Sequence, residues 1–149
     1  ISLGLVGSEM CIRDRVEAVI QHQGKRLRLI GTHPKPPYSA YCAQLRDDQM
    51  NALADYVRQC QEPVLLMGDF NATPYCHAMR VLQTGSKLRF RSDRAPWWPT
   101  WQVGTPLAIP IDHSLCTPPL VITKRQIGPD VGSDHRAQDI VLRWQQTTF

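Results

Sequence analysis

Apolar residues in the first third of the chain alternate with polar ones in two short runs. The runs cover residues 16–21 and 25–32 and are separated by a tripeptide that ends in Gly24. A glycine turn between two such runs is typical of a β-hairpin. Leu27 and Leu29 alternate with arginines, which predicts one buried and one solvated face for the second strand.

The next segment has the spacing of an amphipathic helix. The helix is expected to begin after Ser39, a favourable N-cap residue, and to extend to about Cys60. Its apolar positions are Met50, Leu53, Val57 and Cys60. A continuous apolar run follows at residues 64–67 and is typical of a strand covered on both faces. Together these segments predict a β-α-β unit.

The second half of the chain is predicted to contain one short helix and three more strands. The helix is expected over residues 75–82, ending near Gly85, with a loop over residues 87–110. The expected strands are residues 109–115, 120–127 and 138–144. Strands outnumber helices, and polar clusters fall where strands stop, so we expect an α/β (α+β) fold.

Composition limits the class of protein. The chain has 149 residues, of which 42% are hydrophobic and 20% charged, as in a folded domain rather than a disordered chain. No apolar run approaches the roughly 18–20 residues that span a bilayer. The five cysteines form no CxxC pair, which favours reduced thiols over a disulfide framework or a zinc ribbon.

The net charge of the chain is +4, from 17 basic and 13 acidic side chains. Such a surplus favours a polyanionic or phosphate-bearing partner, but an ordinary solvated surface explains it equally well.

The start of the chain has a different character from the rest. Residues 1–14 show neither a helical nor an alternating pattern, and they lack the basic region and cleavage site of a signal peptide. They resemble translated adapter sequence at the end of a fragmentary read. We therefore expect residues 1–15 to be a non-native leader and residues 16–149 to be part of a larger domain.

Four polar clusters follow or end predicted strands, where α/β proteins collect functional groups from distant parts of the chain. They are THP (32–34), GDFN (68–71), IDH (111–113) and SDHR (133–136). In extended backbone, side chains two positions apart point the same way, so Asp69 and Asn71 are expected to face one pocket while Phe70 enters the core. A carboxylate beside a carboxamide suits an oxygen-preferring cation and a phosphoryl oxygen. Gly68 permits close approach of a substrate or a neighbouring backbone.

The last two clusters supply a second set of candidate groups. The Asp134 carboxylate can serve a metal or a water, and the His135 imidazole can serve a phosphate oxygen. The Asp112 carboxylate can accept a hydrogen bond from the other imidazole nitrogen and fix the tautomer of the ring.

Each cluster also has an ordinary interpretation. An Asp-x-Asn after a strand is most often turn chemistry, and a single His before Pro is usually a loop residue. We interpret His22, His77 and His113 as structural residues, and Cys76 beside His77 lacks the second pair that a zinc site needs. The tryptophans at positions 97, 98 and 101 favour packing over stacking on nucleobases or lining a substrate groove.

Taken together and in this order, the four motifs resemble the endonuclease/exonuclease/phosphatase superfamily of metal-dependent phosphodiesterases, which includes deoxyribonuclease I. The resemblance covers nearly all of the chain after Val16, and the forms THPKPP (32–37) and GDFNATP (68–74) are most similar to a bacterial branch. It implies a four-layered α/β sandwich of the deoxyribonuclease I-like type, with two mixed sheets face to face, helices outside and the active site at one rim.

The resemblance also implies roles for individual residues. Asp69 and Asn71 match the pair that positions the nucleophilic water and the phosphate, and Asp134, with Asp69, matches the metal-associated acids. His135 matches the histidine that contacts the scissile phosphate, and Asp112 matches the carboxylate that orients it.

Further implied residues concern the substrate. His33 matches a histidine that some branches use as a second phosphate contact or as the acid for the leaving group. Selectivity is expected in the loops, where Arg94 and Trp101 are candidate substrate contacts. Nucleic acid and phospholipid or inositol phosphate head groups are all compatible with this set, and no obligate protein partner is evident.

The chain also departs from the superfamily pattern. The first half of such domains supplies an Asn and the Glu that is the main Mg²⁺ ligand, and neither has a counterpart here. We therefore expect residues 16–149 to be the C-terminal part of the domain, which lacks its N-terminal half and does not hold the metal properly by itself.

The expected function is Mg²⁺- or Mn²⁺-dependent phosphodiester hydrolysis by the full-length protein, with the fragment itself inactive. The alternative is a non-catalytic module that binds phosphate or nucleic acid. The sequence leaves the compartment open: the cytoplasm is the default, and a membrane tether in an upstream segment is compatible with it.

Overall fold

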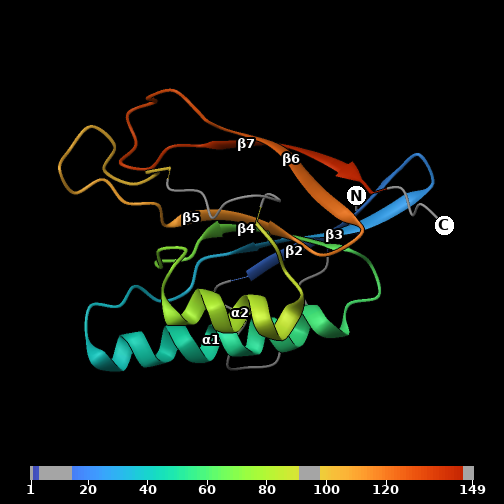
Figure 1. The fold of residues 1–149 in the computed structure, drawn as a ribbon, viewed down its shortest axis with the longest axis horizontal. Helices are drawn as coiled ribbons and strands as arrows, with labels where there is room; N and C mark the ends of the chain where they lie inside the picture. The colour runs from blue at the N-terminus through green and yellow to red at the C-terminus, as the bar shows by residue number, and fades with distance from the viewer. Residues whose placement is uncertain (1, 4–14, 91–97, 146–149) are drawn as a thin grey trace.

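The structure, a computed structural model, describes residues 2–3, 15–90 and 98–145. In this part of the chain, a layer of two helices covers one face of a five-stranded sheet, and a two-stranded sheet lies over the other face (Figure 1). The strand order is β1-β2-β3-β4-β5 in the larger sheet, and β6 pairs with β7 in the smaller one. The prediction of an α/β fold is confirmed.

The predicted hairpin near the start of the domain is present. Strands β2 (Arg15–His22) and β3 (Lys25–Thr32) pair antiparallel, and β1 (Ser2–Leu3) pairs with the outer edge of β2. The turn between them has positive φ at both Gln23 (50°) and Gly24 (75°). Such dihedrals match the twist of a tight two-residue hairpin turn.

The predicted β-α-β unit is also confirmed. Helix α1 (Ala40–Gln59) begins at Ser39, whose hydroxyl accepts a hydrogen bond from the Cys42 N–H at 3.1 Å. The helix leads into β4 (Val64–Asp69), which pairs parallel with β3. The buried side of the helix carries Met50, Leu53, Ala54 and Val57.

The predicted second helix is present, with a shifted start. Helix α2 spans His77–Ser86, so it begins two residues later than expected and includes Gly85. A Cβ at Gly85 would lie 3.1 Å from the Cβ of Ala54 on α1, which shows that this glycine serves close packing of the helices. The helix ends instead at Lys87, which has a left-handed φ of 62°.

The last three strands complete the two sheets. Strands β6 (Leu120–Ile127) and β7 (Gln138–Trp144) lie where the sequence predicts them, and β5 spans Asp112–Cys116. The strand predicted from residue 109 begins later because Ile109 forms an isolated bridge with Trp101 instead. Strand β5 pairs antiparallel with β4, which brings the IDH and GDFN motifs together.

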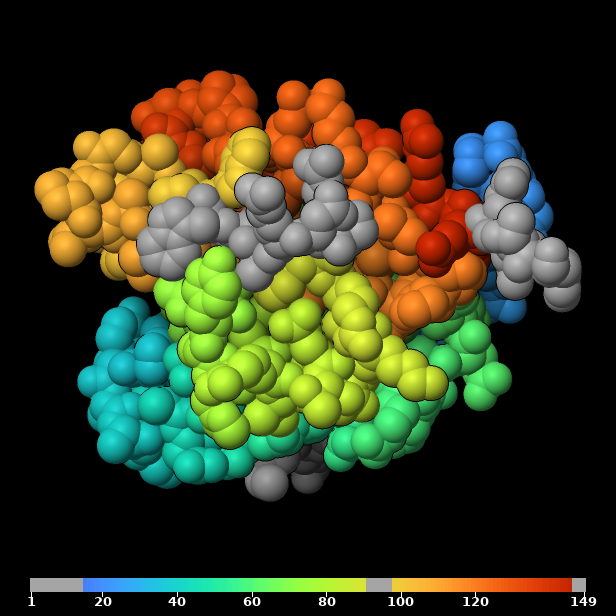
Figure 2. Space-filling model, in the orientation of Figure 1, coloured from blue at the N-terminus to red at the C-terminus, as the bar shows by residue number. Residues whose placement is uncertain are grey.

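Two apolar clusters hold the layers together. The larger one lies between the helices and the five-stranded sheet, and the smaller one lies between the sheets around Leu65, Cys116, Leu120 and Ile122. In the space-filling view the two helices form the lower part of the molecule, and the β-sheet strands and long loops form the upper part (Figure 2). No helix among the described residues is both long and apolar enough to cross a membrane.

Candidate active site

Residues from all four motifs meet at one rim of the five-stranded sheet, beside the loops 98–111 and 128–137 (left in Figure 1). They surround a cavity of about 450 Å³, which we call the rim cavity. It is lined by His33, Pro36, Pro37, Tyr38, Asp69, Asn71, Trp101, Ile109, Ile111, Asp134 and His135. The predicted convergence of strand-end residues is therefore present.

A backbone contact between β3 and β4 positions the side chains of His33 and Asp69 relative to each other. Thr32 and Gly68 are partners in the parallel register, and a Cβ at Gly68 would lie 1.9 Å from the Thr32 carbonyl oxygen. Only glycine fits there. The residues that follow, His33 and Asp69, leave their strands at the same level, and His33 Nε2 lies 3.5 Å from Asp69 Oδ2.

Asp69 and Asn71 line the rim cavity together, but not for the predicted reason. Asn71 has a φ of 48°, so the backbone is not extended there. The Asn71 N–H instead donates to Asp69 Oδ1 at 2.8 Å, which forms an Asx turn. Phe70 is fully buried, as predicted. The side-chain amide of Asn71 donates to the Pro34 carbonyl at 3.0 Å, which ties the GDFN and THP motifs together.

The pKa of the Asp69 carboxyl is raised by some of its surroundings and lowered by others. Burial raises its pKa, and the nearby charge of Asp112 raises it further. The hydrogen bond from the Asn71 N–H and the charges of His135 and His33 oppose this shift without cancelling it. A carboxyl with a raised pKa is a stronger base than an ordinary aspartate.

His135 and Asp112 form the predicted pair. His135 Nδ1 lies 2.9 Å from Asp112 Oδ2, while its Nε2 lies 3.9 Å from Asp69 Oδ2. Partial burial disfavours the imidazolium, but the hydrogen bond to Asp112 and the charges of Asp112, Asp69 and Asp134 outweigh burial and raise the pKa of His135. The pair therefore directs a protonated Nε2 toward the rim cavity.

The backbone of Asp112 is held by two residues that the sequence did not single out. The Asp112 N–H donates to the hydroxyl of fully buried Thr100 at 3.1 Å. Arg125 Nη2 donates to the Asp112 carbonyl at 3.0 Å, and Arg125 Nε donates to Gln138 Oε1 at 2.9 Å. Strict alternation along β6 would place Lys124 inward with Ile122, but an irregularity between these two residues turns Arg125 inward instead. A bulge of this kind has no clear sequence signal.

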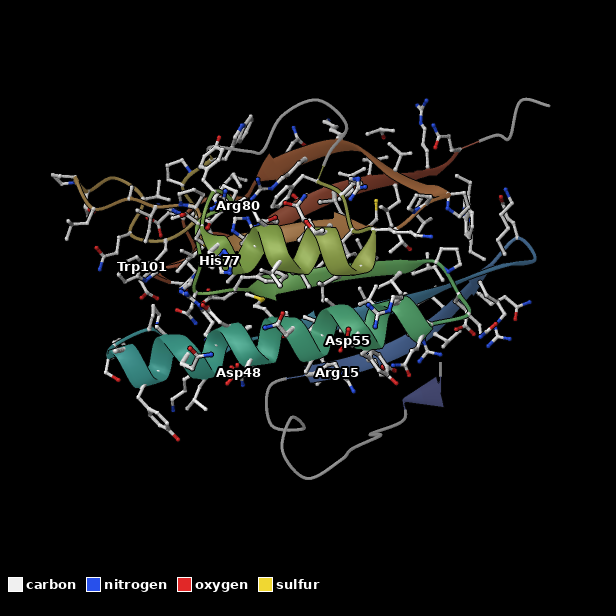
Figure 3. The ribbon with its side chains drawn as sticks, turned by 60° about the horizontal axis from the view of Figure 1, so that its bottom comes forward. Arg15, Asp48, Asp55, His77, Arg80 and Trp101 are labelled. Carbon is white, nitrogen blue, oxygen red and sulfur yellow. The ribbon has the colours of Figure 1, made fainter. Side chains whose placement is uncertain are left out.

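Trp101 and Asp134 form the side of the rim cavity near the loops. Trp101 Nε1 donates to Asp134 Oδ2 at 3.1 Å, and its ring centroid lies 6.4 Å from that of His135. Figure 3 shows Trp101 in a loop beyond the sheet, and His77 at the start of α2. Trp101 thus lines the rim cavity, whereas the other predicted substrate contact, Arg94, lies outside the described residues.

His113 is a structural residue, as predicted. It is almost fully buried, its ring contacts Phe70 and Phe90, and its Nε2 lies 2.7 Å from the Ala72 carbonyl oxygen. Burial lowers the pKa of His113 to about 4. This histidine is therefore neutral at ordinary pH, and its Nε2–H donates to Ala72.

The described residues do not complete a metal site. Asp69 and Asp134 bring carboxylates to the rim cavity, which are oxygen ligands of the kind that Mg²⁺ prefers. However, no group of three or more His, Cys, Asp or Glu side chains within residues 2–3, 15–90 and 98–145 is arranged to hold a metal ion.

Comparisons with known proteins agree with this architecture. A sequence model of the Endonuclease/Exonuclease/phosphatase family matches residues 4–135. No curated protein is significantly similar in sequence. Among solved structures, an endonuclease/exonuclease/phosphatase from Beutenbergia cavernae is 21% identical with a TM-score of 0.72, over 88% of this chain and 39% of that one.

Two further structures are similar in fold. Humanized D. rerio TDP2 is 17% identical with a TM-score of 0.67, over 89% of this chain and 61% of that one. A beta toxin mutant from Staphylococcus aureus with bound magnesium ions is 16% identical with a TM-score of 0.54, over 91% of this chain and 58% of that one. The chain therefore spans 39–61% of the length of these three structures.

Proposed function

Because this chain belongs to the endonuclease/exonuclease/phosphatase family, we propose that it provides the phosphate-binding half of a phosphoric ester hydrolase, with a phosphodiester as the substrate. The observation that carries the proposal is the meeting of His33, Asp69 and His135 in the rim cavity, with Asp69 Oδ2 within 4 Å of both imidazoles. Paired acid and base groups at one cavity are what ester hydrolysis requires.

His135 is proposed to bind the scissile phosphate. Its Nδ1–H donates to Asp112, so its Nε2–H is available to a phosphate oxygen in the rim cavity. The raised pKa keeps the ring protonated to higher pH than an ordinary histidine. An imidazolium placed there stabilises the negative charge that develops on the phosphoryl oxygens.

Asp69 is proposed to orient the attacking water and to take its proton. Its Oδ1 is occupied by the Asn71 N–H, which leaves Oδ2 directed at the two imidazoles and the cavity between them. Asn71 uses one amide hydrogen on Pro34, and its second amide hydrogen is a donor for a phosphate oxygen. His33, whose side chain is 67% exposed, is placed to protonate the leaving group.

Magnesium or manganese is proposed as the cofactor of the complete active site. The similar Staphylococcus aureus structure carries bound magnesium ions, and Asp69 and Asp134 are the candidate ligands in this chain. A divalent cation would stabilise the negative charge that develops on the phosphoryl oxygens. Since the described residues hold no complete site, the remaining ligands are expected from outside them, and the roles above concern this chain's own groups only.

The test is hydrolysis of bis(4-nitrophenyl) phosphate by the full-length protein with MgCl₂. EDTA should abolish the release of 4-nitrophenolate, and excess MgCl₂ should restore it. Asp69→Ala should lower the rate by at least about 10²-fold, the range of a general base. The control is Asp48→Ala, an exposed aspartate on the outer face of α1 (Figure 3), which should leave the rate unchanged. A near wild-type rate for Asp69→Ala would refute the proposal.

A non-catalytic phosphate-binding module is the second candidate function. It is favoured by one observation, the incomplete metal site among the described residues. In that case inorganic phosphate would bind and His135→Ala would weaken binding, but no diester would be hydrolysed with any divalent cation. Measuring phosphate binding by calorimetry beside the hydrolysis assay separates the two functions.

A further inference from the structure

A second cavity lies next to the rim cavity, and residues of the same two loops line it. It has a volume of about 610 Å³ and lies between the loops 98–111 and 128–137. We call it the side cavity. Its volume is within the roughly 300–1,000 Å³ typical of small-molecule sites.

The two cavities adjoin at Asp134, which lines both of them. The Gln102 N–H donates to the Asp134 carbonyl at 2.8 Å, and the Arg136 N–H donates to the Thr100 carbonyl at 2.7 Å. These hydrogen bonds join the two loops, and Asp134 lines both cavities. A group bonded to a phosphate in the rim cavity therefore has the side cavity as its immediate neighbour.

The positive charge of the side cavity is already paired. Arg136 lines it, and the arginine side chain is only 14% exposed. Its Nη2 lies 2.7 Å from Asp130 Oδ2, so the guanidinium that would otherwise receive a phosphate has a carboxylate partner. Asp134 adds a second carboxylate to the lining. The side cavity therefore has no surplus of positive charge to attract an anion.

The remaining wall of the side cavity is largely apolar. Val103, Pro106 and Leu107 contribute to it from one loop. Leu107 is 67% exposed, so its side chain is accessible to a group that enters the side cavity. An apolar wall beside paired charges suits an uncharged organic group with a few polar atoms.

We propose that the side cavity is a specificity subsite that receives the uncharged organic group of a phosphate ester, such as a nucleoside. It excludes a second phosphate because the Arg136 guanidinium is already ion-paired with Asp130. The proposal deepens the proposed function and rests on it for the location of the scissile phosphate. Substrates whose second phosphate would have to enter the side cavity are then discriminated against.

The test measures binding rather than turnover, with three ligands and the full-length protein. The ligands are methyl phosphate, thymidine 5′-monophosphate and thymidine 3′,5′-bisphosphate, titrated by calorimetry. The wild-type protein should bind the nucleotide at least about tenfold more tightly than methyl phosphate, which corresponds to burial of an organic group worth about 1.4 kcal/mol. The bisphosphate should bind no more tightly than the monophosphate.

Filling the side cavity should remove the preference for the nucleotide. Leu107→Trp should weaken binding of the nucleotide about tenfold and leave methyl phosphate within twofold. Val131→Trp is the matched control, because Val131 is an exposed residue of the neighbouring loop that does not line the side cavity. Equal weakening of both ligands by Leu107→Trp, or no weakening of either, would overturn the proposal.

Removing the carboxylate that pairs with Arg136 should allow a second phosphate to bind in the side cavity. In Asp130→Asn, the amide oxygen can still accept from the Gly132 N–H, as Asp130 Oδ1 does at 2.9 Å, but the charge that pairs with Arg136 is lost. Binding of the bisphosphate relative to the monophosphate should increase about fivefold. An unchanged ratio would overturn the charge selection.

Hydrolysis of bis(4-nitrophenyl) phosphate, measured on the same preparations, separates failure of this inference from failure of the proposed function. Wild-type protein that hydrolyses the diester but binds methyl phosphate and nucleotide alike refutes the subsite only. Protein that neither hydrolyses the diester nor binds any of the three ligands refutes both.

Discussion

Two histidines beside Asp112 have opposite environments. His113 follows Asp112 on β5, faces the helices and is almost fully buried against Phe70 and Phe90. His135 comes from a loop 23 residues further along the chain than Asp112 and hydrogen-bonds to it at the rim. Burial holds the pKa of His113 down to about 4, whereas carboxylates raise the pKa of His135.

The difference shows that the surroundings of a residue in the fold, rather than its distance in sequence from Asp112, determine the environment of each histidine. Successive side chains of a strand point to opposite faces, so Asp112 and His113 are separated by the sheet itself. The histidine of the IDH motif supports the core, and the histidine of the SDHR motif reaches the carboxylate of the IDH motif. The predictions below test this division.

The largest expected effect is loss of hydrolysis in His135→Ala. Since the imidazolium is proposed to stabilise developing phosphoryl charge, the rate with bis(4-nitrophenyl) phosphate should fall by about 10²–10³-fold. The melting temperature should change little, because the side chain is only partly buried. His77→Ala, at the exposed start of α2, is the control for removal of a histidine. A comparable loss in that control would contradict the assignment.

His113→Ala should have the converse effect. It leaves a cavity between Phe70 and Phe90 and an unpaired Ala72 carbonyl, so the free energy of unfolding should fall by about 3 kcal/mol in urea titrations. The rate per folded molecule should stay near that of the wild type. A stable variant with a greatly reduced rate would mean that His113 belongs to the active site.

Asp112→Asn should lower the rate of hydrolysis less than His135→Ala does. Without the carboxylate, the pKa of His135 should fall toward its ordinary value, which two-dimensional NMR of the imidazole can follow. We expect the rate of hydrolysis to fall by about 10–100-fold, the range known for removal of a carboxylate behind a metal-ligating histidine. An unchanged pKa of His135 would show that the pair has no electrostatic function.

The smallest expected effect is a dependence of stability on pH that distinguishes the two histidines by sign. Because the pKa of His113 is lowered to about 4, the unfolded chain takes up a proton below about pH 6.5 while the folded chain does not. The free energy of unfolding should therefore decrease as pH falls from about 6.5 to about 4, by about 1 kcal/mol per pH unit.

Substitutions separate the contributions of the two histidines. His113→Gln should flatten this part of the pH profile. His135, whose folded pKa is raised, contributes stability that is present at low pH and lost as pH rises through that pKa. In His135→Gln, the free energy of unfolding should therefore still decrease as pH falls from about 6.5 to about 4. If this decrease were lost in His135→Gln but kept in His113→Gln, His135 and not His113 would be the histidine with the lowered pKa.

Much of the fold follows from local spacing. The hairpin, α1 and the strands β4, β6 and β7 agree with the prediction because hydrophobic periodicity reports which face of an element is buried. The meeting of the four motifs was also predictable, because strand ends gather at one rim. The contact between Asp112 and His135 followed from the chemistry of an imidazole with two nitrogens.

Other features depend on contacts between distant segments. The left-handed Asn71, the inward turn of Arg125 and the pairing of Thr100 with Arg136 leave no periodic signal. The helix expected to end near Gly85 runs to Ser86, and a Cβ at Gly85 would lie only 3.1 Å from the Cβ of Ala54 on the other helix. Sequence spacing reports burial, but it does not report which partner causes it.

The contact between Thr32 and Gly68 has a consequence for how this site tolerates change. Because main-chain atoms touch there, the strands cannot slide or separate without losing the contact, and the spacing between His33 and Asp69 is inherited from the backbone. Gly68 therefore fixes the distance between β3 and β4, and any larger residue at this position would push the two strands apart and displace His33 relative to Asp69.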